Sequence, residues 1–141
     1  MQKKRMILFI CVGNSGRSQI AEGLFNSKAP IGYLAISAGI KPSKEVNPLV
    51  IVAMAEKGID ISKNKPKAIE DWMFRDTERI ILMGCSEDSC PTPFLKKVEN
   101  WQIDDIKGKP IEDIRKAMNQ IESKIHLLVD QLKIASNAKD K

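Results

Sequence analysis

Apolar residues fall along this chain in three short runs and one long periodic stretch. The runs are Met6 to Ile10, Leu34 to Ala38 and Arg79 to Met83. Short runs of this kind, closed by glycine or polar residues, are typical of strands buried on both faces of a parallel sheet. The pattern therefore predicts three buried strands over these residues, and it makes Asn100 to Ile103 a candidate edge strand.

Two helices are marked by their spacing and by their end signals. In the last part of the chain, apolar residues recur at steps of three and four, which places them on one helix face. These residues are Ile111, Ile114, Met118, Ile121, Ile125, Leu128 and Leu132. Earlier in the chain, Asn47 and Pro48 have the order of an N-cap followed by proline at the first helical position. The helix that they begin is expected to run to Ala55, with Gly58 just beyond its end.

A third helix is expected over residues 17–26, with Asn14 or Ser15 as its N-cap. Strands and helices then alternate, which is typical of an α/β domain with a mostly parallel sheet. In such sheets, functional groups gather at the carboxyl ends of the strands. Cys11 directly follows the first strand and Cys85 comes two residues after the third, so both thiols are expected at one edge.

Length and composition limit the kind of protein. The 141 residues suit one domain, expected over residues 1–135, with 136–141 as a frayed tail. No stretch approaches the roughly 18 uncharged apolar residues of a membrane span. The first apolar run is short and enters a polar, glycine-containing loop instead of a signal-peptide cleavage site. A cytoplasmic protein without a membrane partner is expected.

The charge of the chain permits an anionic partner without identifying one. The net charge is +5, but aromatic residues make up only 5% of the chain. Nucleic-acid surfaces interleave aromatic with basic residues, so solvated surface charge is favoured and no nucleic-acid partner is expected. No feature of the sequence points to an oligomer, and a monomer is expected.

The segment from Cys11 to Ser18 reads CVGNSGRS, in which five residues separate the cysteine from Arg17. A loop between a buried strand and a helix N-terminus gathers backbone N–H groups around one point. Those groups and the Arg17 fork would bind a tetrahedral oxyanion, and their positive field favours the thiolate form of Cys11. Ser18 is placed to donate a hydrogen bond to this nucleophile. The expected oxyanion-binding residues are Val12, Gly13, Asn14, Ser15, Gly16, Arg17 and Ser18.

This loop, its place near the N-terminus, the Ser37-Ala38-Gly39 segment and the chain length resemble the low-molecular-weight protein tyrosine phosphatase superfamily. The resemblance implies a three-layer α/β/α fold with a central four-stranded, mostly parallel sheet. The superfamily includes phosphatases and thioredoxin-coupled arsenate reductases, which share the loop and differ elsewhere.

The arsenate reductase branch carries two further cysteines, and this chain has Cys85 and Cys90 in that region. The resemblance implies that Cys11 attacks arsenate, that Cys85 then attacks Cys11 with release of arsenite, and that Cys90 attacks Cys85. Thioredoxin, or a similar dithiol protein, would reduce the final Cys85–Cys90 disulfide. Two inert, buried cysteines are the alternative. A zinc site would need a fourth ligand, and the only histidine, His126, lies on the last predicted helix.

The spacing of these two cysteines is shorter than in the familiar reductases, with only four residues between them. Five helical steps rise about 7.5 Å, whereas a disulfide needs Cα atoms within about 7 Å. A helical segment 85–90 would therefore have to loosen on oxidation, and a mobile segment is expected.

The segment from Trp101 to Lys109 resembles the family segment that carries a general acid. Asp105 falls at the acid position, where it would protonate the departing oxygen, but Ile106 replaces the usual proline. Asp104 is a weaker candidate. The phosphatases place tyrosines near this acid, whereas the only tyrosine here is Tyr33, near the second strand. That difference favours a small inorganic anion over phosphotyrosine.

Asn14, Glu22 and Ser37 resemble a potassium site of some arsenate reductases, although Asn14 would more simply brace the loop. No metal and no other cofactor is expected. The sequence thus predicts an arsenate reductase that uses Cys11, Cys85 and Cys90 in a disulfide relay. The alternative is a phosphatase that hydrolyses phosphomonoesters through a phosphocysteine at Cys11.

Overall fold

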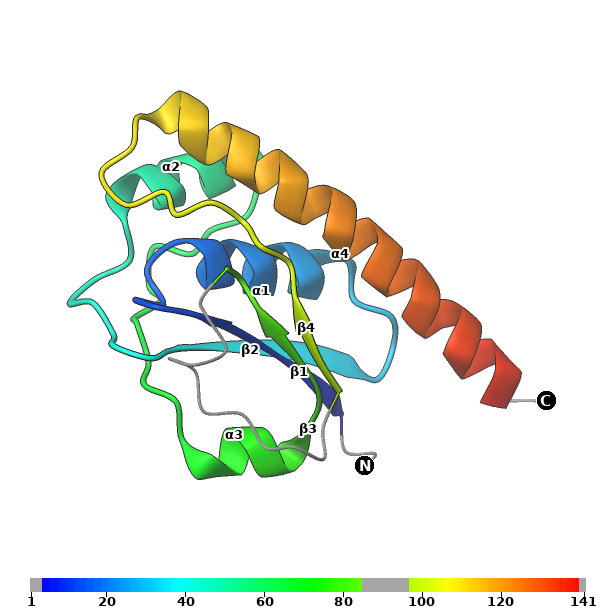
Figure 1. The fold of residues 1–141 in the computed structure, drawn as a ribbon. Helices are drawn as coiled ribbons and strands as arrows, with labels where there is room; N and C mark the ends of the chain where they lie inside the picture. Colours follow the sequence, from blue (N-terminus) through cyan, green and yellow to red (C-terminus); the bar gives the residue numbers. More distant parts are fainter. Residues whose placement is uncertain (1–3, 85–96, 140–141) are drawn as a thin grey trace.

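The computed structural model describes residues 4–84 and 97–139 of the chain (Figure 1). The side chains of residues 97 and 136–139 are outside this description. Cys85 and Cys90 lie outside the described residues, as does the mobility expected for 85–90. The elements are, in order, β1 (Arg5–Cys11), α1 (Arg17–Lys28), β2 (Tyr33–Gly39), α2 (Pro48–Glu56), α3 (Asp71–Asp76), β3 (Thr77–Leu82), β4 (Lys97–Asn100) and α4 (Ile111–Lys139).

The four strands form one sheet in the order β2-β1-β3-β4, and every neighbouring pair is parallel. Cys11 at the end of β1 pairs with Gly39 at the end of β2. Leu82 at the end of β3 pairs with Ile10 on one side and Asn100 on the other. The carboxyl ends of all four strands therefore lie at one edge, as the sequence predicts.

Both faces of the sheet are covered, which gives the molecule three layers. α1, α2 and α4 lie on one face and α3 on the other (Figure 1). Within β1, Phe9 and Cys11 pack toward the three-helix layer, and Leu8 and Ile10 pack toward α3. Because alternate side chains are buried on opposite faces, the strand is apolar throughout. The predicted α/β/α fold with a four-stranded parallel sheet is confirmed.

Two elements differ from the sequence prediction. The edge strand was expected over 100–103 but ends at Asn100, because Gln102 has a φ of 54°, which no strand residue adopts. The Asn100 side chain also accepts a hydrogen bond from the Gln102 N–H at 2.9 Å, as in a turn. α3 was not predicted, since it has only six residues and no side-chain cap at Glu70.

Helix ends also differ from those expected. α1 begins after Gly16 without a side-chain cap, so the prediction that Asn14 or Ser15 caps it is wrong. α2 has the predicted cap, since the Asn47 side chain accepts from the Leu49 N–H. α4 continues to Lys139, so residues 136–139 are helical where a frayed tail was expected. Neither glycine nor proline occurs within this helix to end it earlier.

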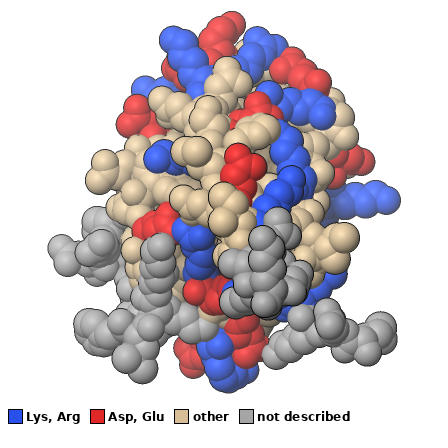
Figure 2. All heavy atoms as spheres, turned by 90° about the vertical axis from the view of Figure 1, so that its right-hand side faces the viewer, with Lys and Arg blue, Asp and Glu red and all other residues tan. Residues whose placement is uncertain are grey.

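The surface charges are of both signs. Figure 2 shows Lys and Arg interspersed with Asp and Glu on the face that it displays. Glu122 of α4 pairs with Lys28 at 3.1 Å and Lys57 at 2.9 Å, and Arg115 pairs with Glu56 at 2.7 Å. Among the helices that the structure describes, none is both long and apolar enough to span a membrane.

Candidate active site

The loop between β1 and α1 is held in place by hydrogen bonds that its carbonyl groups accept from the segment 41–47. The carbonyls of Val12, Gly13 and Ser15 accept N–H donors from residues 41, 43 and 47 at 2.8–2.9 Å. Because C=O and N–H point in opposite directions across a trans peptide, the N–H groups that follow these carbonyls point toward the centre of the loop. The result is the predicted cluster of N–H donors around one point.

Gly39, at the end of β2, lets this loop lie close to the sheet. A Cβ at this position would lie 2.9 Å from the Asn14 nitrogen and 2.9 Å from the Val12 oxygen. Any other residue would therefore push the loop away. Gly39 thus has a steric role in addition to its place in the Ser37-Ala38-Gly39 segment of the family pattern.

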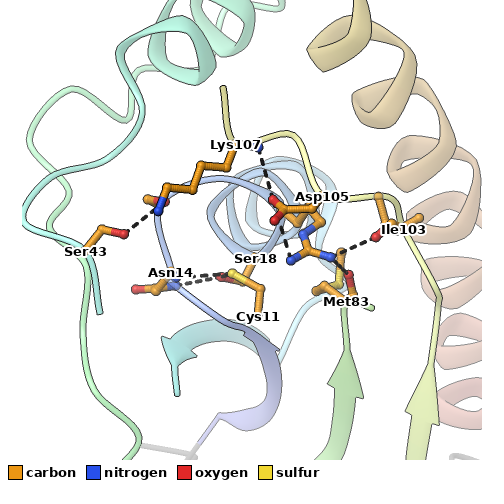
Figure 3. Close-up of polar contacts among 10 residues, drawn as sticks. Cys11, Asn14, Ser18, Ser43, Met83, Ile103, Asp105 and Lys107 are labelled. Atoms are coloured by element: carbon orange, nitrogen blue, oxygen red, sulfur yellow. Dashed lines mark hydrogen bonds and ion pairs between the residues drawn. The ribbon is translucent and has the colours of Figure 1, made fainter. Parts of the chain in front are cut away.

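Cys11 lies at the floor of the loop and is 3% exposed. Its Sγ is 2.8 Å from Ser18 Oγ and accepts the Asn14 N–H at 3.2 Å (Figure 3). Ser18 Oγ itself accepts a hydrogen bond from Asn14 Nδ2 at 2.7 Å. That bond leaves the Ser18 proton free to point at the sulfur.

Asn14 braces the loop from behind and is fully buried, with a φ of 51°. Its Nδ2 also donates to Ser37 Oγ at 3.0 Å. Its Oδ1 accepts from the Lys67 N–H at 2.9 Å and from Gln19 Nε2 at 3.1 Å. These bonds explain why Asn14 does not cap α1. Sequence reasoning missed Gln19, whose only signal is a polar residue on the buried side of α1.

Glu22 extends this network, since Ser37 Oγ donates to its carboxylate at 3.3 Å. Burial raises the pKa of Glu22 above its usual value, and the positive charge of Lys67 opposes that shift. The structure thus brings together Asn14, Glu22 and Ser37, the three residues that resemble a potassium site. The Asn14 and Ser37 oxygens are already used in hydrogen bonds, and Lys67 supplies positive charge. These residues fit a brace and do not fit an ion.

Arg17 connects the loop with the ends of β3 and β4. Its Nη1 donates to the carbonyls of Met83 and Ile103, each at 2.8 Å (Figure 3). Its Nη2 lies 3.9 Å from Asp105 Oδ1. The side chain is buried against the sheet edge and also lines the pocket.

The loop opens into a pocket of about 340 Å³ that contains Cys11, Arg17 and Asp105 in its lining. The other lining residues are Val12, Gly13, Ser15, Gly16, Lys41, Pro42, Ser43, Asn47, Ile106 and Lys107. No aromatic residue is among the described residues that line it. The three positive side chains in the lining outnumber the one carboxylate, which suits an anion.

Asp105 reaches the pocket from the segment after β4. Its side chain is 67% exposed, and its Oδ1 accepts the Lys107 N–H at 3.0 Å. The next residue, Ile106, is 4% exposed, and its Cδ1 would lie 3.1 Å from a Cβ placed on Gly16. Ile106 thus anchors the segment by packing, where the family pattern has a proline. Asp104 is not part of the pocket lining.

The chain is similar to known proteins in both sequence and fold. Residues 6–138 match the model of the family described as low molecular weight phosphotyrosine protein phosphatase. An arsenate reductase of Staphylococcus aureus (strain Newman) is 37% identical over 120 residues, which are 84% of this chain and 91% of that protein.

Two solved structures are similar in fold and sequence. A thioredoxin-dependent arsenate reductase of Corynebacterium glutamicum has a TM-score of 0.80 and 33% identity over 95% of this chain. The match covers 64% of the Corynebacterium chain, so this chain spans less than two thirds of its length. An arsenate reductase of Archaeoglobus fulgidus has a TM-score of 0.78 and 34% identity over 88% of this chain and 98% of that one. The chain belongs to the low molecular weight phosphotyrosine protein phosphatase family.

Proposed function

We propose that this protein reduces arsenate to arsenite through a thiol–arsenate adduct on Cys11. The observation that carries the proposal is the Cys11 sulfur at the floor of a small, positively lined pocket, whose lining contains no aromatic side chain among residues 4–84 and 97–139. The relatives described as arsenate reductases support it. A further support is Gly84, which lies against Arg17 and directly precedes Cys85 in the chain.

In the first step the Cys11 thiolate attacks the arsenic of hydrogen arsenate, and the arsenate hydroxyl takes a proton from Asp105 and leaves as water. The loop N–H groups and Arg17 hold the remaining oxygens, where negative charge develops. Cys85 then attacks the Cys11 sulfur. The S–As electron pair goes to arsenic, which is reduced from As(V) to As(III) and leaves as arsenite.

The oxidation is then passed outward along the chain. Cys90 attacks Cys85 in the Cys11–Cys85 disulfide, which frees Cys11 for the next turnover. A thioredoxin-like dithiol protein supplies two electrons to reduce the Cys85–Cys90 disulfide. Such a relay needs all three thiols reduced at rest, which suits the cytoplasm, and every group in it comes from one chain, which suits a monomer.

The variant Cys85→Ser tests this function. We expect it to lose steady-state arsenate turnover by at least about 100-fold while its aryl-phosphate kcat/KM stays within about threefold of wild type. Cys11→Ser is expected to abolish both activities. In the wild type without reductant, one equivalent of arsenate should leave one of the three thiols titratable.

Normal arsenate turnover by Cys85→Ser would overturn the thiol relay. If the wild type itself does not reduce arsenate but hydrolyses a phosphomonoester efficiently, the protein is a phosphatase with a phosphocysteine at Cys11. The family that the chain matches makes that second outcome chemically coherent.

A further inference from the structure

The Arg17 guanidinium is held by the backbone carbonyls of Met83 and Ile103, which follow the ends of two different strands. We call this pair of carbonyls the Arg17 seat. Met83 follows β3 and Ile103 lies after β4, and Nη1 donates to both at 2.8 Å. An Nη nitrogen has two hydrogens, so these two bonds use both of them. These two bonds fix the plane of the guanidinium, and its Nη2 lies 3.9 Å from Oδ1 of Asp105, a residue that lines the pocket.

Gly84 lies against this seat. Its φ is +111°, a region that L side chains rarely adopt. A Cβ on Gly84 would lie 2.5 Å from the Ile103 oxygen and 2.6 Å from Arg17 Nη1. These two atoms are the two ends of one hydrogen bond, so a side chain at position 84 would enter that bond.

The flexible partner in such a clash is Arg17. Ile103 is 3% exposed, and the segment that leads to it is tied to β3 by the Trp101 N–H bond to the Leu82 carbonyl at 2.9 Å. Moving this backbone would disturb the buried core, whereas the Arg17 side chain can change rotamer. A methyl group at position 84 is therefore expected to displace the guanidinium from its seat.

We propose that Gly84 is a positioning residue for oxyanion binding, because the space left by its missing side chain seats Arg17 between Met83 and Ile103. This inference rests on the oxyanion-binding part of the proposed function and does not depend on the thiol relay. Since Cys85 follows directly, the same seat ties the oxyanion ligand to the start of the segment that carries the resolving thiol.

The test compares Gly84→Ala with Gly32→Ala. Gly32 also has a positive φ, of +93°, but nothing lies within 4 Å of its Cβ position. Both variants carry the backbone strain, and only Gly84→Ala meets Arg17. We expect Gly84→Ala to raise the inhibition constant of inorganic phosphate and the KM for an aryl phosphate by at least about tenfold, whereas Gly32→Ala changes them less than about twofold.

A double-mutant cycle with Arg17→Lys identifies the route of the effect. If Gly84 acts through Arg17, then Gly84→Ala adds less than about twofold to the phosphate inhibition constant in the Arg17→Lys background. Equal effects in both backgrounds would overturn the inference, as would an unchanged inhibition constant in Gly84→Ala alone. Should Arg17→Lys itself leave phosphate binding unchanged, the oxyanion role of Arg17 in the proposed function fails instead.

If Gly84→Ala does not fold, the inference can be tested on the wild-type protein by NMR. The measurement is the backbone amide resonance of Gly84 during a titration with inorganic phosphate. Phosphate titration should shift this resonance and leave that of Gly32 in place, and Arg17→Lys should abolish the shift. A Gly84 resonance that does not respond to saturating phosphate would overturn the inference.

Discussion

Two of the segments that line the pocket are built in opposite ways. The loop from Cys11 to Ser18 buries its polar groups, and Asn14 and Ser18 are fully buried and hydrogen-bonded within the protein. The segment from Ile103 to Lys109 presents Asp105 with its side chain 67% exposed, with a turn bond to the Lys107 N–H and with Arg17 Nη2 at 3.9 Å. We call the segment from Cys11 to Ser18 the cradle. We call the segment from Ile103 to Lys109, which presents Asp105 to solvent, the arm.

This difference suits the two tasks that the proposed function assigns to these segments. Donors that stabilise developing negative charge act best when they are already oriented, because no reorganisation is then needed during the reaction. A general acid has to reach one departing oxygen and must exchange its proton with solvent between turnovers. Burial suits the first task and exposure suits the second.

The largest effect expected in this comparison comes from the exposed arm. Asp105→Asn removes the proton donor, and we expect kcat for an aryl phosphate to fall by at least about 100-fold with KM within about threefold. The control is Asp104→Asn, whose carboxylate is outside the pocket lining and whose kcat should stay within about twofold of wild type. Steady-state kinetics of both variants measure this, and equal losses in the two would show that Asp105 is not the acid.

The sequence predicts the cradle better than the arm for physical reasons. Cys11, the glycines and Arg17 lie within one short segment between a buried strand and a helix, so local spacing is sufficient. The bracing partners of Asn14 come from elsewhere: Ser37 from β2 and Lys67 from the segment before α3. Nothing in local spacing indicates such distant contacts.

The arm was harder to predict because one backbone angle determines its course. Gln102 has a φ of 54°, which ends β4 and redirects the chain toward the pocket. Ile106 reads as an interruption of the family pattern, and only the structure shows that it is buried against Gly16. The close approach of Gly84 to Arg17 and Ile103 also cannot be predicted from the sequence, because these two neighbours come from α1 and from the segment after β4.

An intermediate effect is expected from the brace of the cradle. Asn14→Ala removes the side-chain hydrogen bonds to Ser18, to Ser37 and to the Lys67 N–H, and each such bond contributes about 0.5–1.5 kcal/mol to stability. We expect kcat/KM for an aryl phosphate to fall by about 10- to 100-fold, together with a lower Tm. Kinetics and thermal unfolding measure the two effects.

The control for this variant is Asn26→Ala, which removes two side chain–backbone bonds to Ala35, of 3.0 and 2.8 Å, at the other end of α1. It should lower the Tm to a similar degree and leave kcat/KM within about twofold. If Asn14→Ala lowers only the Tm, as this control does, Asn14 supports the fold and not the geometry of the cradle.

The smallest effect is expected where the arm rests on the cradle. Ile106→Ala removes the packing against Gly16, and a buried Ile→Ala change costs about 2–5 kcal/mol of stability. Because the cradle and Arg17 are intact, the phosphate inhibition constant should stay within about twofold, whereas kcat should fall by about five- to tenfold as Asp105 loses its fixed position. Ile61→Ala, at a core position 3% exposed and outside the pocket lining, should lose similar stability without a change in kcat.

Ile106 would then replace the family's proline as a support for the acid, since packing and a rigid ring are two ways to restrict the same short segment. A rise in the phosphate inhibition constant equal to the loss in kcat would show instead that Ile106 shapes the cradle itself.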